Sequence, residues 1–305
     1  MCYMQGHYDE LWGLAMHPTK LQFCTGAEDE TLRVWDLEAR TFVGMAKLEG
    51  PVRCACYSPN ADWIAVGLGG KMIKHKSNGK WVVLDSKTLN VLYTPKHTRF
   101  ERVADIKFSP DSKFVAVANA DNGIDIFSVP GHGNKFNEFK QVAKFEGHSS
   151  FVTHIDWSMD STKLRSNCGA HELLFWKMYK PTSDTRLAPH QEKSTSRMRD
   201  EEWHTQSCIY GWSVRGIWPE GADGTDINAC ARSNQGGRDL LATCDDHGKV
   251  KIFRFPCIVP DADCKPYTGH SSHVTNAAFS KDDKWLISTG GEDRGVFQWE
   301  VVREK

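Results

Sequence analysis

The chain has 305 residues, 40% of them hydrophobic and 25% charged, which is typical of a soluble globular protein. A formal net charge of −1 excludes a protein that holds nucleic acid through bulk positive charge. No run of about eighteen apolar residues occurs, which excludes a membrane-spanning helix, and the length suits one large all-β domain.

The N-terminal segment and the cysteines predict a cytosolic protein. Residues 1–7 lack the basic and apolar regions of a secretory signal. We therefore expect the ten cysteines to be reduced thiols that pack as small core residues of a cytosolic protein. Cys54 and Cys56 would share one face of a strand, which favours packing, and no Cys-x-x-Cys pair suggests a metal. The sequence predicts no metal and no cofactor.

A unit of three apolar runs recurs six times. The first run ends in an aromatic-Ser-Pro-like turn, the second in small residues and Asp, and the third in an aromatic residue. The first-turn markers are Pro18, Pro59, Pro110, Met159, Pro219 and Lys281. The spacing between Pro18 and Pro59 matches the about 40–45 residues of a WD40 blade. Later units are longer because loops are inserted. The approximate repeats are 6–46, 47–95, 96–145, 147–192, 193–268 and 269–305.

Within each unit, short runs alternate apolar and polar residues, which is the pattern of half-buried strands. Residues 103–108 are an example, and no segment keeps a helical period of about 3.6, so helices should be minor. The sequence predicts an all-β WD40 β-propeller array that fills residues 1–305 as a single domain. It forms either a closed six-bladed ring or six blades of a larger propeller truncated at the N-terminus.

Residues 1–5 separate these two arrangements, because they are predicted to form an outer strand. In a closed ring this strand pairs with the last repeat, which joins the termini and removes exposed edges. In an open arc it belongs to a missing neighbour. We expect closure, with contact between residues 2–5 and 296–301.

Two repeats carry the polar residues that brace a WD40 blade. A turn Asp holds a His, the His reaches a Ser or Thr, and this hydroxyl reaches the Trp indole, so the buried polar groups are paired. The candidates are His7, Thr25, Asp29 and Trp35 in the first repeat, and His270, Thr289, Asp293 and Trp299 in the sixth. Because the same spacing occurs twice, we interpret these residues as scaffold and not as a nucleophile relay.

Other repeats are incomplete. The fourth keeps His148 and Trp176 but has Gly169-Ala170-His171 where the turn Asp is expected. The second has no His before Val52. We expect apolar packing alone to hold these two blades.

Three further segments are interpreted as loops. Residues 223–226 (Asp-Gly-Thr-Asp) lack the ligand pattern of a calcium loop and predict a turn. The mixed charges of residues 182–202 predict a solvated loop or, alternatively, a partner contact. Residues 131–135 predict a flexible insertion.

Several stretches are more specific than a generic blade. Residues 218–229 read Trp-Pro-Glu-Gly-Ala-Asp-Gly-Thr-Asp-Ile-Asn-Ala, and the other distinctive stretches are 6–15, 147–154, 270–276 and 288–291. Together they resemble the C-terminal half of the echinoderm microtubule-associated protein-like (EMAP-like) family over nearly the whole chain. The resemblance implies a microtubule-associated protein of the cytoplasm and cytoskeleton.

The sequence departs from that family in what precedes the repeats. Members usually carry an N-terminal coiled coil, a hydrophobic motif and a first propeller, and none of these is found in residues 1–305. We therefore expect a fragment, a truncated gene product or a lone half. Avidity that depends on self-association would then be missing.

Three functions are compared. The leading hypothesis is a non-enzymatic scaffold that binds tubulin or microtubules, and the alternative is a generic WD40 scaffold for signalling or axonemal partners. A propeller hydrolase would need acidic or His residues around a central channel, whereas the best Asp and His positions here belong to the blades. We expect no nucleic acid, membrane or small-molecule substrate as a partner.

Partner contacts are expected at the face where the first strand of each blade begins. Propellers commonly use the loops of this face. The exposed candidates are Tyr8, Glu10, Phe151 and His273, with Trp212 and Arg215 as weaker ones. For each, the alternative is ordinary surface.

Overall fold

The computed structural model describes residues 2–70, 72–73, 76–77, 79–96, 101–131, 138–179, 188–234 and 239–302. It separates into two compact units, one of Met1–Val52 with Ile209–Lys305 and the other of Arg53–Cys208. Each unit contains three four-stranded antiparallel sheets, which we call blades and number by their repeats. None of the helices in these described ranges is both long and apolar enough to span a bilayer.

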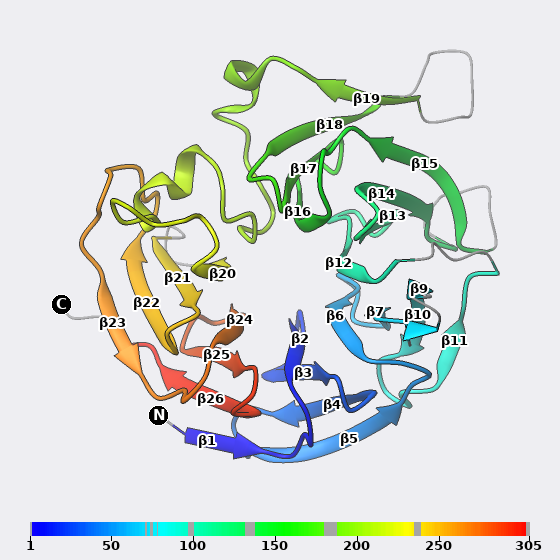
Figure 1. Cartoon of the computed structure of the whole chain (residues 1–305). Helices are drawn as coiled ribbons and strands as arrows, with labels where there is room; N and C mark the ends of the chain where they lie inside the picture. Colours follow the sequence, from blue (N-terminus) through cyan, green and yellow to red (C-terminus); the bar gives the residue numbers. More distant parts are fainter. Residues whose placement is uncertain are drawn as a thin grey trace. The chain divides into compact units, whose positions relative to one another are not determined.

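The first unit holds the first, fifth and sixth blades (Figure 1). The first blade consists of β2 (Leu11–Met16), β3 (Gln22–Ala27), β4 (Thr31–Asp36) and β5 (Thr41–Lys47). The 3₁₀ helix η2 (Trp212–Ile217) precedes the fifth blade, which consists of β20 (Ile227–Arg232), β21 (Leu240–Asp245), β22 (Lys249–Arg254) and β23 (Lys265–Thr268). The sixth blade consists of β24 (Val274–Phe279), β25 (Trp285–Gly290), β26 (Gly295–Glu300) and β1 (Cys2–Gln5).

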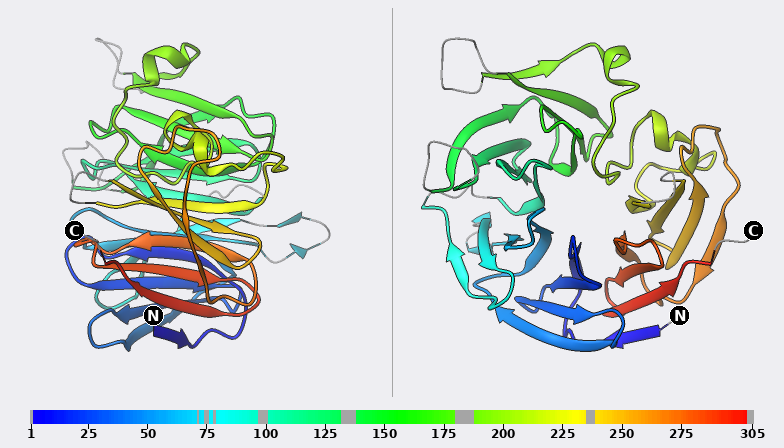
Figure 2. Two further views of the ribbon diagram at one scale, coloured as in Figure 1. Left: turned by 90° about the vertical axis from the view of Figure 1, so that its left-hand side faces the viewer. Right: turned by 180° about the vertical axis from the view of Figure 1, so that it is seen from behind.

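The N-terminal strand completes the sheet of the last repeat. Strand β1 runs antiparallel to β26, with Met4 opposite Val296 and Gln5 opposite Gly295, and Figures 1 and 2 both show the two strands side by side. The pairing satisfies the backbone groups along the outer edge of β26. The contact that we expected between residues 2–5 and 296–301 is therefore present.

Side chains on both faces of the strands build the core of the first unit. In β3, Phe23 and Cys24 are fully buried, and on β2 Leu11 is also fully buried. Leu11 and Phe23 pack in one cluster with Ile287 and Val296 of the sixth blade. Each fully buried side chain of this size contributes about 1.5–3 kcal/mol relative to an exposed one. Because the strands of a blade have apolar groups on both faces, each blade must be covered by neighbours, which is the property that makes blades stack.

The second unit holds the second, third and fourth blades. The second consists of β6 (Val52–Tyr57), β7 (Trp63–Leu68), β10 (Lys80–Asp85) and β11 (Val91–Tyr93), with β8 (Met72–Ile73) and β9 (Lys76–Ser77) paired as a small separate hairpin. The third consists of β12 (Val103–Phe108), β13 (Phe114–Asn119), β14 (Gly123–Ser128) and β15 (Lys140–Glu146). The fourth consists of β16 (Val152–Trp157), β17 (Lys163–Cys168), β18 (Leu173–Tyr179) and β19 (Ala188–Glu192), followed by the 3₁₀ helix η1 (Thr195–Met198).

Aromatic packing takes the place of the polar network in the second blade, as we expected from its missing His. The Trp81 ring lies 4.8 Å from that of Phe127, 5.4 Å from that of Tyr93 and 5.8 Å from that of Phe139, between ring centroids. Such tilted and edge-to-face pairs add about 0.5–1.5 kcal/mol each beyond the burial of their area.

A buried ionic cluster joins the third and fourth blades inside the second unit. Asp156 is fully buried and accepts hydrogen bonds from the Arg165 guanidinium at 3.0 and 3.1 Å and from the backbone N–H of Ser207 and Cys208. The Lys107 ammonium lies 3.4 Å from Asp156. Burial alone would raise the pKa of Asp156, but these two cations and the hydrogen bonds hold it far below its usual range.

Within the ranges that the structure describes, six four-stranded sheets and only short helices confirm the all-β prediction with six repeats. The reading of residues 1–305 as one domain stays a prediction. The solvated loop predicted at 182–202 is wrong at residues 188–192, which form β19, and at Met198, whose side chain is buried with Phe175 and Trp203. Residues 182–187 of that segment lie outside the described residues, as do residues 132–135 of the predicted insertion. Residues 223–226 do form a turn, in which Asp223 accepts from the Thr225 N–H at 2.7 Å.

Candidate functional site

The first blade contains the hydrogen-bonded chain that its spacing predicts. The Trp35 indole N–H donates to Thr25 Oγ1 at 2.8 Å, and Thr25 Oγ1 lies 2.8 Å from His7 Nε2. His7 Nδ1 lies 2.9 Å from Asp29 Oδ2. With the indole and the imidazole Nδ1 as donors, the Thr25 hydroxyl donates to Nε2, and every member of the chain is paired.

The turn carboxylate of this blade also anchors the loop ahead of β2. Asp29 accepts hydrogen bonds from the backbone N–H of Tyr8 at 3.1 Å and from the Thr31 hydroxyl at 2.6 Å. Burial would raise the pKa of Asp29, but the bonds from His7, Thr31 and Tyr8 hold it well below its usual range. The carboxylate is therefore ionised at neutral pH and fixes the backbone that presents Tyr8.

In the sixth blade the hydroxyl belongs to Ser288, so the assignment of Thr289 is wrong. Ser288 Oγ lies 2.8 Å from His270 Nε2 and accepts from the Trp299 indole N–H at 2.8 Å. His270 Nδ1 lies 2.8 Å from Asp293 Oδ2. The Thr289 hydroxyl instead lies 3.0 Å from that of Thr275.

The error has a geometric cause. Thr25 is paired with Arg33, two residues before the Trp of its blade, and Ser288 is paired in the same way with Phe297. The turn that follows β25 is one residue longer than the turn that follows β3, so counting four residues back from Asp293 ends on the wrong residue. Gly290 makes room in that turn, since a Cβ there would lie 1.8 Å from Asp293 Oδ1.

The fourth blade also has a polar network, so the expectation of apolar packing alone is wrong for it. Ser166 Oγ accepts from the Trp176 indole N–H at 2.8 Å and lies 2.6 Å from His148 Nε2. Glu172 supplies the carboxylate, with Oε2 at 3.3 Å from His148 Nδ1. The longer side chain of Glu reaches the His from a position beyond the turn, where spacing based on Asp does not look for it.

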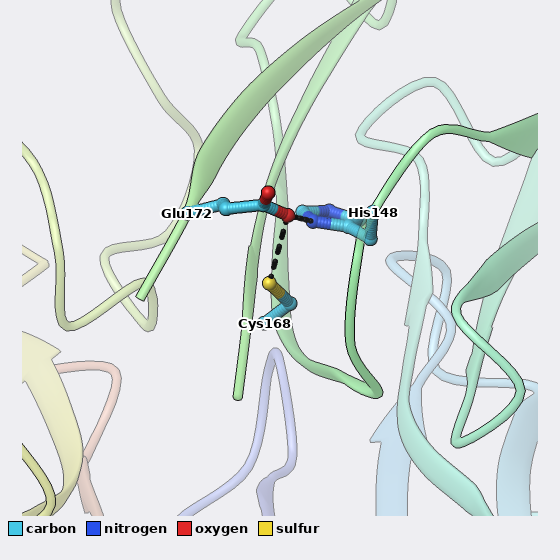
Figure 3. A group of neighbouring side chains, drawn as sticks. All are labelled: His148, Cys168 and Glu172. Carbon is cyan, nitrogen blue, oxygen red and sulfur yellow. Dashed lines mark hydrogen bonds and ion pairs between the residues drawn. The ribbon is translucent and has the colours of Figure 1, made fainter. Parts of the chain in front are cut away.

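Two more groups hold Glu172 in place. Its Oε2 accepts from the Ser149 N–H at 3.0 Å, and its Oε1 accepts from the Ser149 hydroxyl at 2.7 Å. Cys168 Sγ lies 3.1 Å from Oε2 (Figure 3). The hydrogen bonds from Ser149, followed by those from Cys168 and His148, lower the pKa of Glu172 to about 2. Burial lowers the pKa of His148, against the opposing effect of Glu172, so its imidazole is neutral.

Three of the predicted contact residues lie in the first unit, on the loops that precede β2 and β24. Tyr8 is 75% exposed, its ring lies 5.3 Å from the Arg33 guanidinium, and its carbonyl accepts from Arg294 Nη1 at 2.9 Å. Glu10 and His273 are half-buried rather than exposed. The sequence reasoning missed Arg294, although its place directly after the turn Asp of the sixth repeat could have indicated it.

Phe151 lies in the second unit, at the start of β16, and is 41% exposed. Its ring covers Gly169, where a Cβ would lie 2.5 Å from the ring. The Arg102 guanidinium lies 6.0 Å from the ring centroid. Phe151 is thus an exposed aromatic residue with a cation beside it, as Tyr8 is.

Trp212 and Arg215 lie on η2 and are both exposed. With Tyr210, Trp218 and Pro260 they line an open pocket of about 530 Å³. The Tyr210 and Trp218 rings stack at 5.2 Å, and the Trp218 indole N–H donates to the Ile209 carbonyl at 3.0 Å. The first residue of the distinctive stretch 218–229 therefore has a structural role in this insertion.

Comparison with known proteins finds one family that matches nearly the whole chain. A family model described as "Echinoderm microtubule-associated protein second beta-propeller" matches residues 11–301. The chain is 44% identical over 299 residues to the 77 kDa echinoderm microtubule-associated protein of Lytechinus variegatus, covering 98% of this chain and 42% of that protein. It is 41% identical over 301 residues to echinoderm microtubule-associated protein-like 2 of Mus musculus (98% and 43%). It is also 41% identical over 298 residues to echinoderm microtubule-associated protein-like 1 of Homo sapiens (98% and 34%). The chain thus spans less than half the length of these relatives.

Proposed function

This chain belongs to the echinoderm microtubule-associated protein family, and from that membership we propose that it is a non-enzymatic WD40 scaffold that binds tubulin or microtubules. The observation that carries the proposal is the match of microtubule-associated relatives to 98% of the chain. The proposed place of action is the cytoplasmic microtubule cytoskeleton.

The absence of enzymatic activity is part of the proposal. His7 and His270 each lie within hydrogen-bond distance of an Asp and a hydroxyl, as a nucleophile relay would require. In both blades, however, that hydroxyl also accepts the indole N–H of a Trp, and both imidazoles are buried. These groups are satisfied by one another and stabilise the blade.

The proposed contact surface contains Tyr8 and Arg294. His273 of the sixth blade accepts a hydrogen bond through its carbonyl from the N–H of Gly291, in the turn that carries Arg294. Tyr and Arg are the residue types that most often dominate binding energies at protein interfaces. Asp29 holds the Tyr8 backbone, so the aromatic ring is presented by a fixed loop and little conformational entropy is lost on binding. Phe151 offers the same chemistry in the second unit.

Co-sedimentation tests the proposal. The full chain is mixed with taxol-stabilised microtubules and, separately, with soluble tubulin, and the bound fraction is measured against tubulin concentration. We expect saturable binding that Tyr8→Ala weakens by about fivefold to tenfold, as the loss of an interface aromatic does. Tyr267→Ala is the matched control, because Tyr267 is an exposed tyrosine on the outer strand β23.

Absence of binding to both microtubules and soluble tubulin would overturn this function. In that case the alternative, a scaffold for signalling or axonemal proteins, would be tested by recovering one stoichiometric partner without tubulin. Equal weakening by Tyr8→Ala and Tyr267→Ala would contradict the proposed surface while leaving tubulin binding in place.

A further inference from the structure

The fourth blade differs from the first and sixth by one sulfur atom at the open end of its polar network. Cys168 occupies the strand position held by Ala27 in the first blade and by Gly290 in the sixth, two residues after the bridging hydroxyl. Among the described residues, His148, Cys168 and Glu172 are the one group of metal-ligating side chains whose donor atoms all lie within 4.8 Å of one another. Figure 3 shows the three side chains pointing toward a common centre.

We propose that His148, Cys168 and Glu172 bind one divalent cation of the zinc class. An imidazole nitrogen, a thiolate sulfur and a carboxylate oxygen are the donor types that Zn²⁺ uses in proteins. Bond lengths of about 2.0–2.3 Å place the donors of a tetrahedral zinc about 3.3–3.7 Å apart. Here the His148 Nδ1–Glu172 Oε2 and Cys168 Sγ–Glu172 Oε2 separations are 3.3 and 3.1 Å, so small side-chain movements bring the donors to that geometry.

The surroundings already orient two of the three ligands. A metal-bound His usually donates its other ring N–H to a fixed acceptor, and Ser166 Oγ lies 2.6 Å from His148 Nε2. Glu172 is held through both oxygens by Ser149. Both supporting side chains are therefore in place before the cation arrives, and only the His148 tautomer and the Ser166 hydroxyl proton have to change, which reduces the entropic cost of binding.

Access and charge also fit a cation. The His148 side chain is 1% exposed and Cys168 is equally buried, but the Glu172 side chain is 33% exposed, so the cation enters from the Glu172 side. On binding, the thiol proton leaves to water and Cys168 coordinates as the thiolate. His148 loses its Nδ1 proton to solvent and gains one at Nε2, where the Ser166 hydroxyl oxygen accepts it, so that Nδ1 is free to bind the cation. The thiolate and the Glu172 carboxylate then neutralise the two positive charges, and water occupies the fourth position of the tetrahedron.

The site would connect three segments of the fourth blade. His148 precedes β16, Cys168 ends β17 and Glu172 precedes β18. A bound cation would therefore stiffen the loop that leads to Phe151. The inference goes beyond the proposed microtubule function and does not depend on it.

Metal titration of the full chain tests the inference. The protein is stripped with EDTA, dialysed, and titrated with Zn²⁺ alone by calorimetry or with Co²⁺ alone by absorption. We expect one equivalent of Zn²⁺ and, with Co²⁺, a near-ultraviolet thiolate-to-cobalt charge-transfer band. Cys168→Ala should remove the band and weaken Zn²⁺ binding by at least about tenfold. Cys24→Ala, which removes a buried thiol of the first blade, should change neither.

Two results would overturn the site. One is no stoichiometric Zn²⁺ binding by the unaltered chain, and the other is an unchanged band or affinity in Cys168→Ala, which would place the cation on other side chains. If Cys168→Ala does not fold, Cys168→Ser and Glu172→Gln take its place, and each should weaken Zn²⁺ binding by at least about tenfold. Microtubule binding measured in EDTA keeps the outcome for the proposed function separate.

Discussion

The first and fourth blades both place a carboxylate beside the Nδ1 atom of a buried His, but the two carboxylates come from different residues. In the first, Asp29 lies in the turn, 5% exposed, and reaches His7 at 2.9 Å. In the fourth, Ala170 stands at the equivalent turn position, and Glu172 reaches His148 at 3.3 Å with its side chain 33% exposed. The two turns have a similar backbone: Glu30 and His171 have positive φ, at 64° and 62°, and the N–H of each donates to the carbonyl three residues earlier.

The comparison shows that a blade with this buried His requires an oxygen atom near His Nδ1 and not a particular residue in the turn. A neutral, buried imidazole whose Nδ1–H has no acceptor would cost about 1–3 kcal/mol, which favours any side chain that can reach it. Glu172 meets this requirement from two residues further along the chain, with a longer contact and more exposure. Because the Glu172 side chain is partly exposed, a further ligand can reach the polar network of the fourth blade.

The largest expected effect concerns the bridging hydroxyl. Ser288→Ala should lower the free energy of unfolding by about 2–3 kcal/mol, because it leaves the His270 and Trp299 nitrogens without their shared partner. Thr289→Val should cost no more than about 1 kcal/mol, since it removes only the bond to Thr275. Urea denaturation measures both variants. A larger loss in Thr289→Val would show that the sixth blade is bridged as the spacing suggested and not as the structure has it.

A smaller effect is expected from moving the carboxylate of the fourth blade. Glu172→Ala should lower the free energy of unfolding by about 1–2 kcal/mol, because His148 Nδ1 and Ser149 lose their acceptor. Adding Ala170→Asp places a carboxylate where Asp29 stands in the first blade and should restore about 1 kcal/mol. Urea denaturation of the single and double variants provides the measurement. If the double variant is no more stable than Glu172→Ala, the two turns are not equivalent.

The smallest effect is on the pH dependence of stability. Glu172 has its pKa lowered to about 2 in the folded chain from its ordinary value of 4.5. A carboxyl group with a depressed folded pKa stabilises the fold above its unfolded pKa, and this contribution is lost as pH falls through the folded value. Stability should therefore decline between about pH 4.5 and pH 2, and less steeply in Glu172→Gln. Partial exposure keeps the difference small. Parallel pH profiles of the two proteins would contradict this assignment.

Particular residues show how far sequence reasoning reaches. The set His7, Thr25, Asp29 and Trp35 could be assigned from spacing, because the turn between β3 and β4 has the standard length. Ser288 could not, because one additional residue in the next equivalent turn shifts the count. Glu172 could not be assigned from spacing either, because the Asp of the first blade points to position 170, although an acidic residue shortly before Trp176 was the available signal.

By itself, the sequence determined the repeat and the strands, because period-two alternation and turn residues are local properties that recur in each copy. The distinctive stretches, residues 218–229 above all, indicated the family. Only the tertiary structure decided which atoms meet: that β1 completes the sheet of β26, that Ser288 and Glu172 complete two networks, and that Cys168 lies beside them. Strand register and side-chain reach set these contacts, and both depend on turn lengths and on partners distant in the chain.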